Sequence, residues 1–244
     1  GRVRQYGSLL HGRVQQGHGL MFTVGPAFWG GAASDPFAAN VTALLHFNGA
    51  NGSTTFTDEL GGSWAPLSSP YDGGTISTAQ FRFGGASLGL NTDILINSTP
   101  SPGLDLTGDF TVECWVFLGG APAPTNTLFY MSDGTGLDVT IQITSTSVTL
   151  VYALESNLPQ NASSSMVGRW AHVFVGVSGS TRYVGVDGLI ASASKTSTAG
   201  ASASIFIGGV SDAAMWVDDL RITQGLCRYT GVSYTVPTNE FPNP

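Results

Sequence analysis

The stretch VDDLRITQGLCRYT, residues Val217 to Thr230, places two carboxylates side by side at the start of a segment that alternates like a β-strand. Strict alternation puts Asp218 on the same face as Leu220 and Ile222, and Asp219 on the opposite face. An unpaired carboxylate is costly to bury. We therefore expect Asp218 to accept hydrogen bonds from backbone N–H groups, to bind a cation, or to lie at the rim of a sheet.

The chain from Val41 onward shows the same period of two. β-Branched and aromatic residues dominate five runs: TVECWVF (Thr111–Phe117), LDVTIQI (Leu137–Ile143), SVTLVY (Ser147–Tyr152), WAHVFVGV (Trp170–Val177) and RYVGVDGLIAS (Arg182–Ser192). Short polar breaks separate these runs, and Asp187-Gly188 is a strong signal for a two-residue hairpin turn. No helical pattern of ten or more residues interrupts them. The pattern predicts an all-β fold, a two-sheet antiparallel sandwich forming one domain over residues 41–244.

Composition narrows the class of protein. The 244 residues are enough to bury a full core, and only 10% are charged, against about 25% in a typical domain. This composition argues against disorder. A net charge of −7 disfavours nucleic acid and anionic membranes as partners, and no apolar run approaches the ~20 residues of a membrane span. Cys114 and Cys227 lie in apolar contexts without CxxC spacing, which favours two free thiols over a disulfide.

Residues 1–40 are Gly-rich and lack sustained alternation. Three arginines fall in the first thirteen positions: Arg2, Arg4 and Arg13. GRVRQYGSLLH (Gly1–His11) is similar to GRVQQGHGLMF (Gly12–Phe22), an eleven-residue repeat that chance would also explain. Several aromatic residues of this segment need apolar surroundings, among them Phe22, Phe28 and Trp29. We interpret residues 1–40 as an extended N-terminal arm or tether that contacts a neighbouring subunit or adds to a sheet edge.

The acids do not form a catalytic pair. Glycoside hydrolysis needs two carboxyl groups about 5 to 10 Å apart across the scissile bond. None of the four glutamates has another acid two to four residues away in the required strand pattern: Glu59, Glu113, Glu155 and Glu240. Glu113 comes nearest and is interpreted as a structural acid. No nucleophile elbow precedes a helix, and His46 and His172 are expected to make ordinary hydrogen bonds. We expect no enzymatic activity.

Five phrases follow one another from about Thr42 to Pro242: TALLHFNGANGSTTFTDELGGSW (Thr42–Trp64), STAQFRFGGASLGL (Ser77–Leu90), LTGDFTVECWVFL (Leu106–Leu118), GRWAHVFVGVSGSTRYVGVDGLIAS (Gly168–Ser192), and VDDLRITQGLCRYT with the Pro-rich end VPTNEFP (Val236–Pro242). In this order they resemble the laminin G-like, concanavalin A-like jelly-roll domains of bacteriophage tail and other virion proteins. The resemblance implies a two-sheet jelly roll in which a first strand near Leu44–Phe47 pairs with a last strand near Asp218–Thr223.

The same resemblance implies a possible structural calcium where the last strand meets the first. Related folds hold this ion with a strand carboxylate and backbone carbonyls, which here would be Asp218 and the turn at Asn48 and Gly49. Calcium takes six to eight oxygens, and only one side-chain carboxylate is evident at this place. The alternative is that Asp218 caps backbone amides, with Arg221 or Arg228 nearby.

A binding role would rest on aromatic residues near strand ends or in loops, where they could stack on a sugar ring: Trp64, Tyr71, Tyr130 and Trp216. The alternative is that each belongs to the core or its rim. The resemblance implies a noncatalytic virion structural protein that decorates a phage head or tail. It would bind other virion proteins through residues 1–40, form a homo-oligomer for which a trimer is plausible, and contact a cell-surface glycan. Alternatives are a receptor-binding tail-fibre module and, more remotely, a polysaccharide depolymerase.

Overall fold

A computed structural model of the chain describes nine ranges: 34–67, 73–90, 94–99 (backbone only), 106–122, 125–132, 139–153, 155–200, 204–209 and 213–244. They all belong to the second of two units, which spans Ala33–Pro244 and is compact. Six residues proposed for the arm lie outside the described residues: Arg2, Arg4, Arg13, Phe22, Phe28 and Trp29. Residues 34–40, which the sequence analysis assigned to the arm, contact the sandwich through Asp35, which accepts hydrogen bonds from Arg221 and Arg228.

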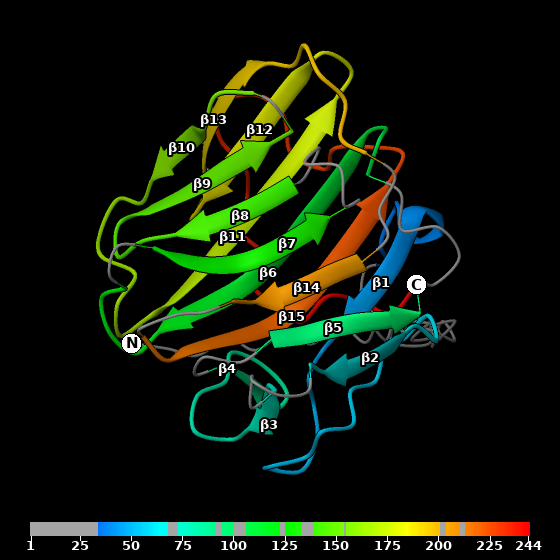
Figure 1. Cartoon of the computed structure of the whole chain (residues 1–244), viewed down its shortest axis with the longest axis vertical. Coiled ribbons are helices and arrows are strands. Elements are labelled where there is room, and N and C mark those ends of the chain that lie inside the picture. Colours follow the sequence, from blue (N-terminus) through cyan, green and yellow to red (C-terminus); the bar gives the residue numbers. More distant parts are fainter. Residues whose placement is uncertain are drawn as a thin grey trace, which may run out of the picture. The chain divides into compact units, whose positions relative to one another are not determined.

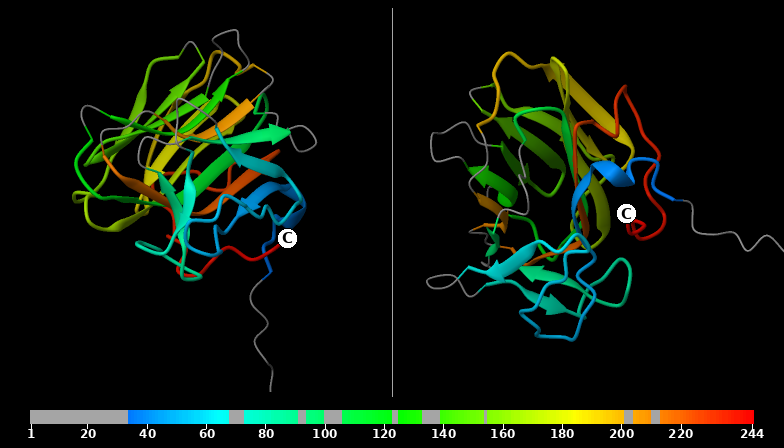
Figure 2. Two further views of the ribbon diagram at one scale, coloured as in Figure 1. Left: turned by 60° about the horizontal axis from the view of Figure 1, so that its bottom comes forward. Right: turned by 90° about the vertical axis from the view of Figure 1, so that its right-hand side faces the viewer.

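The described residues form two antiparallel sheets (Figures 1 and 2). In hydrogen-bonded order, sheet A contains β13 (Leu189–Ser194), β12 (Thr181–Val186), β11 (Trp170–Ser178), β6 (Phe110–Leu118), β15 (Met215–Gln224), β4 (Ser87–Leu90) and β3 (Thr75–Ser77), with β1 (Val41–Leu45) also paired to β15. Sheet B, whose strands follow one another across Figure 1, contains β10 (Leu158–Asn161), β9 (Ser147–Tyr152), β8 (Val139–Ile143), β7 (Asn126–Ser132), β14 (Ser204–Gly208), β5 (Ile94–Thr99) and β2 (Ser63–Pro66). The predicted two-sheet sandwich is confirmed.

Helical structure is minimal in the part of the chain that the structure describes. It consists of one 3₁₀ turn, η1 (Ala38–Asn40). No helix among the described residues has the length and apolar character needed to cross a membrane. The predicted hairpin turn at Asp187-Gly188 is confirmed, because it joins β12 to β13 with φ angles of 48° and 92°. Glycine tolerates such positive φ angles, and aspartate is among the few other residues that adopt them.

The core lies between the two sheets and follows from alternation along each strand. In β8 and β9 every second side chain is buried: Val139, Ile141, Ile143, Val148, Leu150 and Tyr152. Burying each aliphatic side chain contributes about 1.5 to 3 kcal/mol. The intervening side chains are partly exposed on the outer face of sheet B, as expected for a sheet with one solvated face.

The central strands β6 and β11 of sheet A are buried on their outer face as well. We call residues 225–244, which follow β15, the C-terminal strap. The rings of Tyr229 and Tyr234 in the strap lie 4.8 and 5.0 Å from the ring of Phe174 on β11. The Tyr234 backbone N–H donates to the carbonyl of Gly188, and Phe241 packs on β1. This cover explains why β6 and β11 are buried along nearly their whole length.

The first and last strands pair, as the resemblance implied. Leu45 lies opposite Leu220, and Val41 lies opposite Thr223. Figure 2 shows the blue first strand beside the red C-terminal strap. The two ends of the domain therefore meet on sheet A.

Strict alternation fails at the two adjacent acids. On β15, Asp218 lies opposite Trp115 of β6 while Arg221 lies opposite Glu113, so three steps along β15 match two along β6. This is a β-bulge, and Asp219 within it adopts a φ of 52°.

The bulge reverses the phase of the strand. Val217 before it and Leu220 and Ile222 after it all point into the main core. The prediction that Asp218 shares a face with Leu220 and Ile222 is therefore wrong, because the extra residue moves Asp218 to the outer face.

Candidate functional site

The bulge lies where the neighbour of β15 changes from β4 to β1. Asp218 uses this interruption to hold a loop: its Oδ2 accepts hydrogen bonds from the backbone N–H groups of Arg82 (2.6 Å) and Phe83 (3.0 Å). Its Oδ1 is buried and has no hydrogen-bond partner among the described residues. Burial is the largest influence on the Asp218 carboxyl and raises its pKa to about 7, although the two amide bonds act in the opposite direction.

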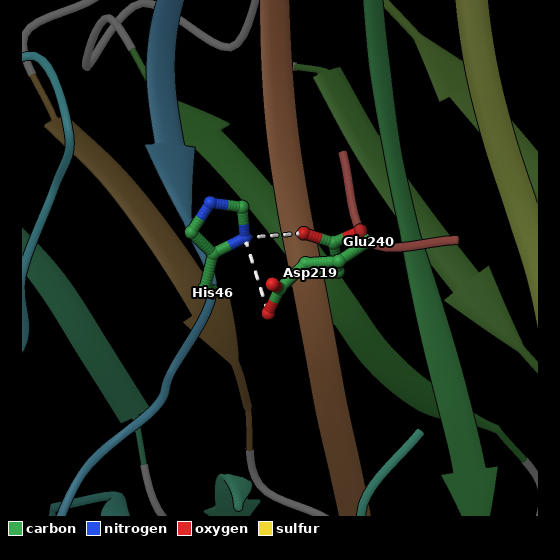
Figure 3. Close-up of side chains that lie close together, drawn as sticks. All are labelled: His46, Asp219 and Glu240. Atoms are coloured by element: carbon green, nitrogen blue, oxygen red, sulfur yellow. Dashed lines mark hydrogen bonds and ion pairs between the residues drawn. The ribbon is translucent and has the colours of Figure 1, made fainter. Parts of the chain in front are cut away.

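Asp219 joins the beginning of the domain to its end (Figure 3). Its Oδ1 lies 2.7 Å from Nδ1 of His46, and its Oδ2 accepts a hydrogen bond from the backbone N–H of Phe241 at 2.7 Å. Glu240 of the strap approaches the same ring nitrogen, with Oε1 at 3.7 Å. Nε2 of His46 lies 2.8 Å from the side-chain oxygen of Asn243. The cluster of His46, Asp219 and Glu240 therefore fastens the strap to β1 and β15.

The charge state of this cluster follows from its geometry. Burial alone would lower the pKa of His46, but the hydrogen bonds with Asp219 and Asn243 and the charges of Asp219 and Glu240 outweigh burial and raise that pKa to about 9. His46 is thus an imidazolium at neutral pH. One ligand atom from each of the three side chains lies within 4.8 Å of the others, so the cluster could hold a divalent metal ion. Such an ion would have to displace the Nδ1 proton.

The residues proposed for calcium offer few oxygens. The Oδ2 atom of Asp218 is engaged by two N–H donors, which leaves Oδ1 as its free oxygen. Asn48 donates from Nδ2 to Oε1 of Glu240 at 2.8 Å, so it supports the strap cluster. Asp218 and Asn48 alone do not supply the six to eight oxygens of a calcium site. Calcium at these residues stays a prediction.

Glu113 lies in a buried ionic network beneath the strap. Its Oε1 accepts hydrogen bonds from Nε and Nη2 of Arg221 at 2.9 and 2.7 Å, and its Oε2 accepts one from the Tyr229 hydroxyl at 2.7 Å. Burial alone would raise the pKa of Glu113, but the Arg221 charge and the contacts with His172 and Tyr229 lower it to about 2. A buried carboxylate locked in this way cannot reach a substrate, which fits the structural interpretation of Glu113.

The four aromatic residues proposed for sugar binding differ in their positions. Trp64 is buried in the core and donates its indole N–H to Oδ2 of Asp58 at 3.0 Å. Trp216 is half-buried on sheet A, where it packs edge-on against Phe117 and donates to Oγ of Ser77. Tyr71 lies outside the described residues. Of the three that the structure describes, Tyr130 lines a groove.

This groove, about 430 Å³ in volume, lies on the outer face of sheet B over β7, β8 and β14. Tyr130 and Phe206 are cross-strand partners whose ring centroids lie 5.7 Å apart, with an angle of 30° between the rings. Thr127 and Thr140 line the groove beside them, and Leu67 and two glycines complete the lining. The arrangement combines apolar ring faces with hydroxyl groups.

Residues 91–224 match the family model of the concanavalin A-like lectin/glucanases superfamily. The chain belongs to this superfamily. A comparison with curated protein sequences finds no significant match. The concanavalin A-like domain is thus assigned by its family pattern and its two-sheet fold.

Solved structures with this fold include receptor-binding domains of botulinum neurotoxins. The type D domain is 12% identical, with a TM-score of 0.60 over 78% of this chain and 50% of that chain. The type G domain is 11% identical, with a TM-score of 0.59 over 78% and 49%. Trypanosoma rangeli sialidase, solved in complex with sialic acid, is 16% identical, with a TM-score of 0.55 over 76% and 31%. The concanavalin A-like domain spans about half the length of the toxin domains, and these identities establish likeness of fold only.

Sequence reasoning missed several residues of both sites. No motif marks the groove residues Phe206, Thr127 and Thr140, because each belongs to a short strand. Alternation in SIFIG and VTIQI would nevertheless place Phe206 and Thr140 on the outer face. No pattern in the sequence links His46 with Glu240. Only the pairing of the first strand with the last, combined with the return of the strap, brings them together. Cys114 and Cys227 are both free, as predicted.

Proposed function

We propose that this concanavalin A-like domain is a noncatalytic glycan-binding module that uses the groove on sheet B. The observation that carries the proposal is the pair of partly exposed rings, Tyr130 and Phe206, flanked by Thr127 and Thr140. Ring faces pack on the apolar C–H faces of a pyranose, and threonine hydroxyls exchange hydrogen bonds with its hydroxyl groups. Binding sites of this type combine an apolar surface with a few polar groups that orient the ligand.

The cover over sheet A supports this choice of surface. The C-terminal strap and the loop at Arg82 and Phe83 occupy much of the outer face of that sheet. Sheet B carries a groove on its outer face, bordered by residues of three adjacent strands. A ligand could therefore contact Tyr130 and Phe206 without displacing any part of the described chain.

The described lining of the groove supports a noncatalytic role, because it contains no aspartate and no glutamate. The seven strands of sheet B contain neither aspartate nor glutamate within their bounds. Most glycosidases use two carboxyl groups on opposite sides of the scissile bond. The buried Glu113 lies on sheet A, under the strap. Binding is thus the role that the described groove supports.

We further propose that the domain is displayed on a bacteriophage particle and attached to other virion proteins through residues 1–40, within a homo-oligomer. The support is the series of phrases between Thr42 and Pro242 and the Gly-rich, basic composition of the first forty residues. Deleting Gly1–Ala32 keeps Asp35 and the compact unit that starts at Ala33. We expect the shortened chain to fold and to be missing from purified particles; normal incorporation would contradict the tether.

Binding can be tested on a glycan array with the full chain and two variants, Tyr130→Ala and Phe206→Ala. We expect the wild type to bind a subset of glycans and each variant to lose at least about tenfold in affinity, which is ~1.4 kcal/mol. Tyr183→Ala, a half-buried tyrosine of sheet A, serves as the matched control and should bind normally. Circular dichroism and the thermal midpoint would show that the variants are folded. Undiminished binding by both folded groove variants would exclude this site.

A further inference from the structure

Sheet B carries no charged residue in any of its seven strands. Their sequences are SWAP, ILINST, NTLFYMS, VTIQI, SVTLVY, LPQN and SIFIG. Charged residues are uncommon in the whole chain, yet sheet A contains five of them within its strands: Glu113, Arg182, Asp218, Asp219 and Arg221. The groove is therefore built on the uncharged sheet.

The described side chains that line the groove are uncharged as well. Its polar groups are the hydroxyls of Tyr130, Thr127 and Thr140, and among the described residues it contains no acid and no base. A side chain at Gly209 would place its Cβ 2.9 Å from the Cβ of Thr127, so glycine is needed to leave room beside that threonine. The groove thus offers hydroxyls and ring faces to a ligand, but no ionic partner.

The five arginines of the second unit contact other groups, and its one lysine follows a strand of sheet A. Arg221 and Arg228 pair with Asp35, and Arg221 also pairs with Glu113 under the strap. Two further arginines, Arg169 and Arg182, approach Asp187 and Glu155, at 2.7 and 3.8 Å. The guanidinium of Arg82 lies 4.3 Å from the ring centre of Trp115 on sheet A. Lys195 directly follows β13 of sheet A.

The connections next to the groove strands add only negative charge by sequence. Residues 133–138, between β7 and β8, read DGTGLD, and residues 210–212, after β14, read VSD. Residues 68–72, after Leu67, read SSPYD. None of these stretches contains lysine or arginine, and the whole chain has a net charge of −7. By sequence, these connections therefore supply no lysine or arginine that could pair with an anionic ligand.

We infer that the groove selects neutral glycans and rejects sialylated and other anionic ones. The inference rests on the proposed glycan-binding function and names the class of ligand for the same site. A carboxylate entering the groove would lose water without gaining a cation from the described lining, which is unfavourable. A neutral hexose requires only the ring faces and hydroxyls that Tyr130, Phe206, Thr127 and Thr140 supply.

Matched oligosaccharide pairs test this selectivity. The full chain is titrated with oligosaccharides chosen from its own array profile, each compared with the same oligosaccharide carrying a terminal sialic acid. We expect the sialylated member to bind at least about tenfold more weakly. Thr140→Lys adds a cation inside the groove and should narrow or reverse this preference. Thr149→Lys adds the same charge to β9, outside the groove lining, and should leave the preference as in the wild type.

The outcomes separate this inference from the function on which it rests. Equal or tighter binding of the sialylated members by the wild type would overturn the selectivity and leave glycan binding standing. A wild-type chain that binds no glycan of either kind would overturn the proposed function itself. Selectivity that is unchanged in a folded Thr140→Lys variant would also count against the inference, because the missing cation would then not be its cause.

Discussion

Replacing His46 with glutamine removes the ion pair that fastens the C-terminal strap. The folded-state pKa of about 9, against an ordinary value of 6.5, corresponds to about 3 kcal/mol of stabilisation while the imidazolium persists. The Glu240 side chain is 36% exposed, so solvent screens part of this interaction and we expect about 1 to 2 kcal/mol. Because the pKa is raised on folding, the stabilisation is complete below about pH 6.5 and is lost as the pH rises through about 9.

Urea unfolding measured from pH 6 to pH 10 provides the assay for His46→Gln. The free energy of unfolding of the wild type should exceed that of His46→Gln by about 1 to 2 kcal/mol at pH 6. The curves of the two proteins should converge near pH 10. Asn48→Ala serves as a control, because it loses only the hydrogen bond to Glu240 and keeps the titrating ring. A difference between wild type and His46→Gln that stays constant over this range would refute the ion pair.

Two further substitutions probe the buried acids. Glu113→Gln leaves Arg221 without its main buried partner and should cost about 3 kcal/mol in urea unfolding while glycan binding persists; lost binding with unchanged stability would contradict the structural role. Because burial raises the pKa of Asp218, the contribution of this carboxyl to stability should fall as the pH rises toward 7, so the free energy of unfolding of the wild type should decrease relative to that of Asp218→Asn. If calcium is held by Asp218 and Asn48, chelation should lower the thermal midpoint of the wild type but not of Asp218→Asn, and equal sensitivity would end that hypothesis.

The fold could be predicted because its signal is local. Alternation in Thr111–Phe117 and Ser147–Tyr152 requires strands of a half-buried or buried sheet, and the Asp187-Gly188 turn fixes one hairpin. The bulge at Asp218 and Asp219 could not be read in the same way. One extra residue changes the phase of a strand without altering its composition, so alternation gave the wrong face for Asp218.

The sites depended on contacts between distant residues. His46 and Asp219 are 173 positions apart and meet only because the first and last strands pair. Tyr130 was predicted as a sugar-contacting ring, but its partner Phe206 joins it through the pairing of β7 with β14. Trp64 looked equally suited from sequence, yet its position on β2 points it into the core. Exposure of an aromatic ring is a property of sheet order, which short strand sequences do not encode.

Mapping a bound sugar on the protein tests the central claim most directly. Amide and methyl NMR spectra of the full chain would be recorded during titration with the neutral oligosaccharide that binds best on the array. We expect the shifts to concentrate at Thr127, Tyr130, Thr140 and Phe206, while the strap and the His46 cluster stay unperturbed. Shifts centred on the strap or on the loop at Arg82, with sheet B unchanged, would contradict that claim.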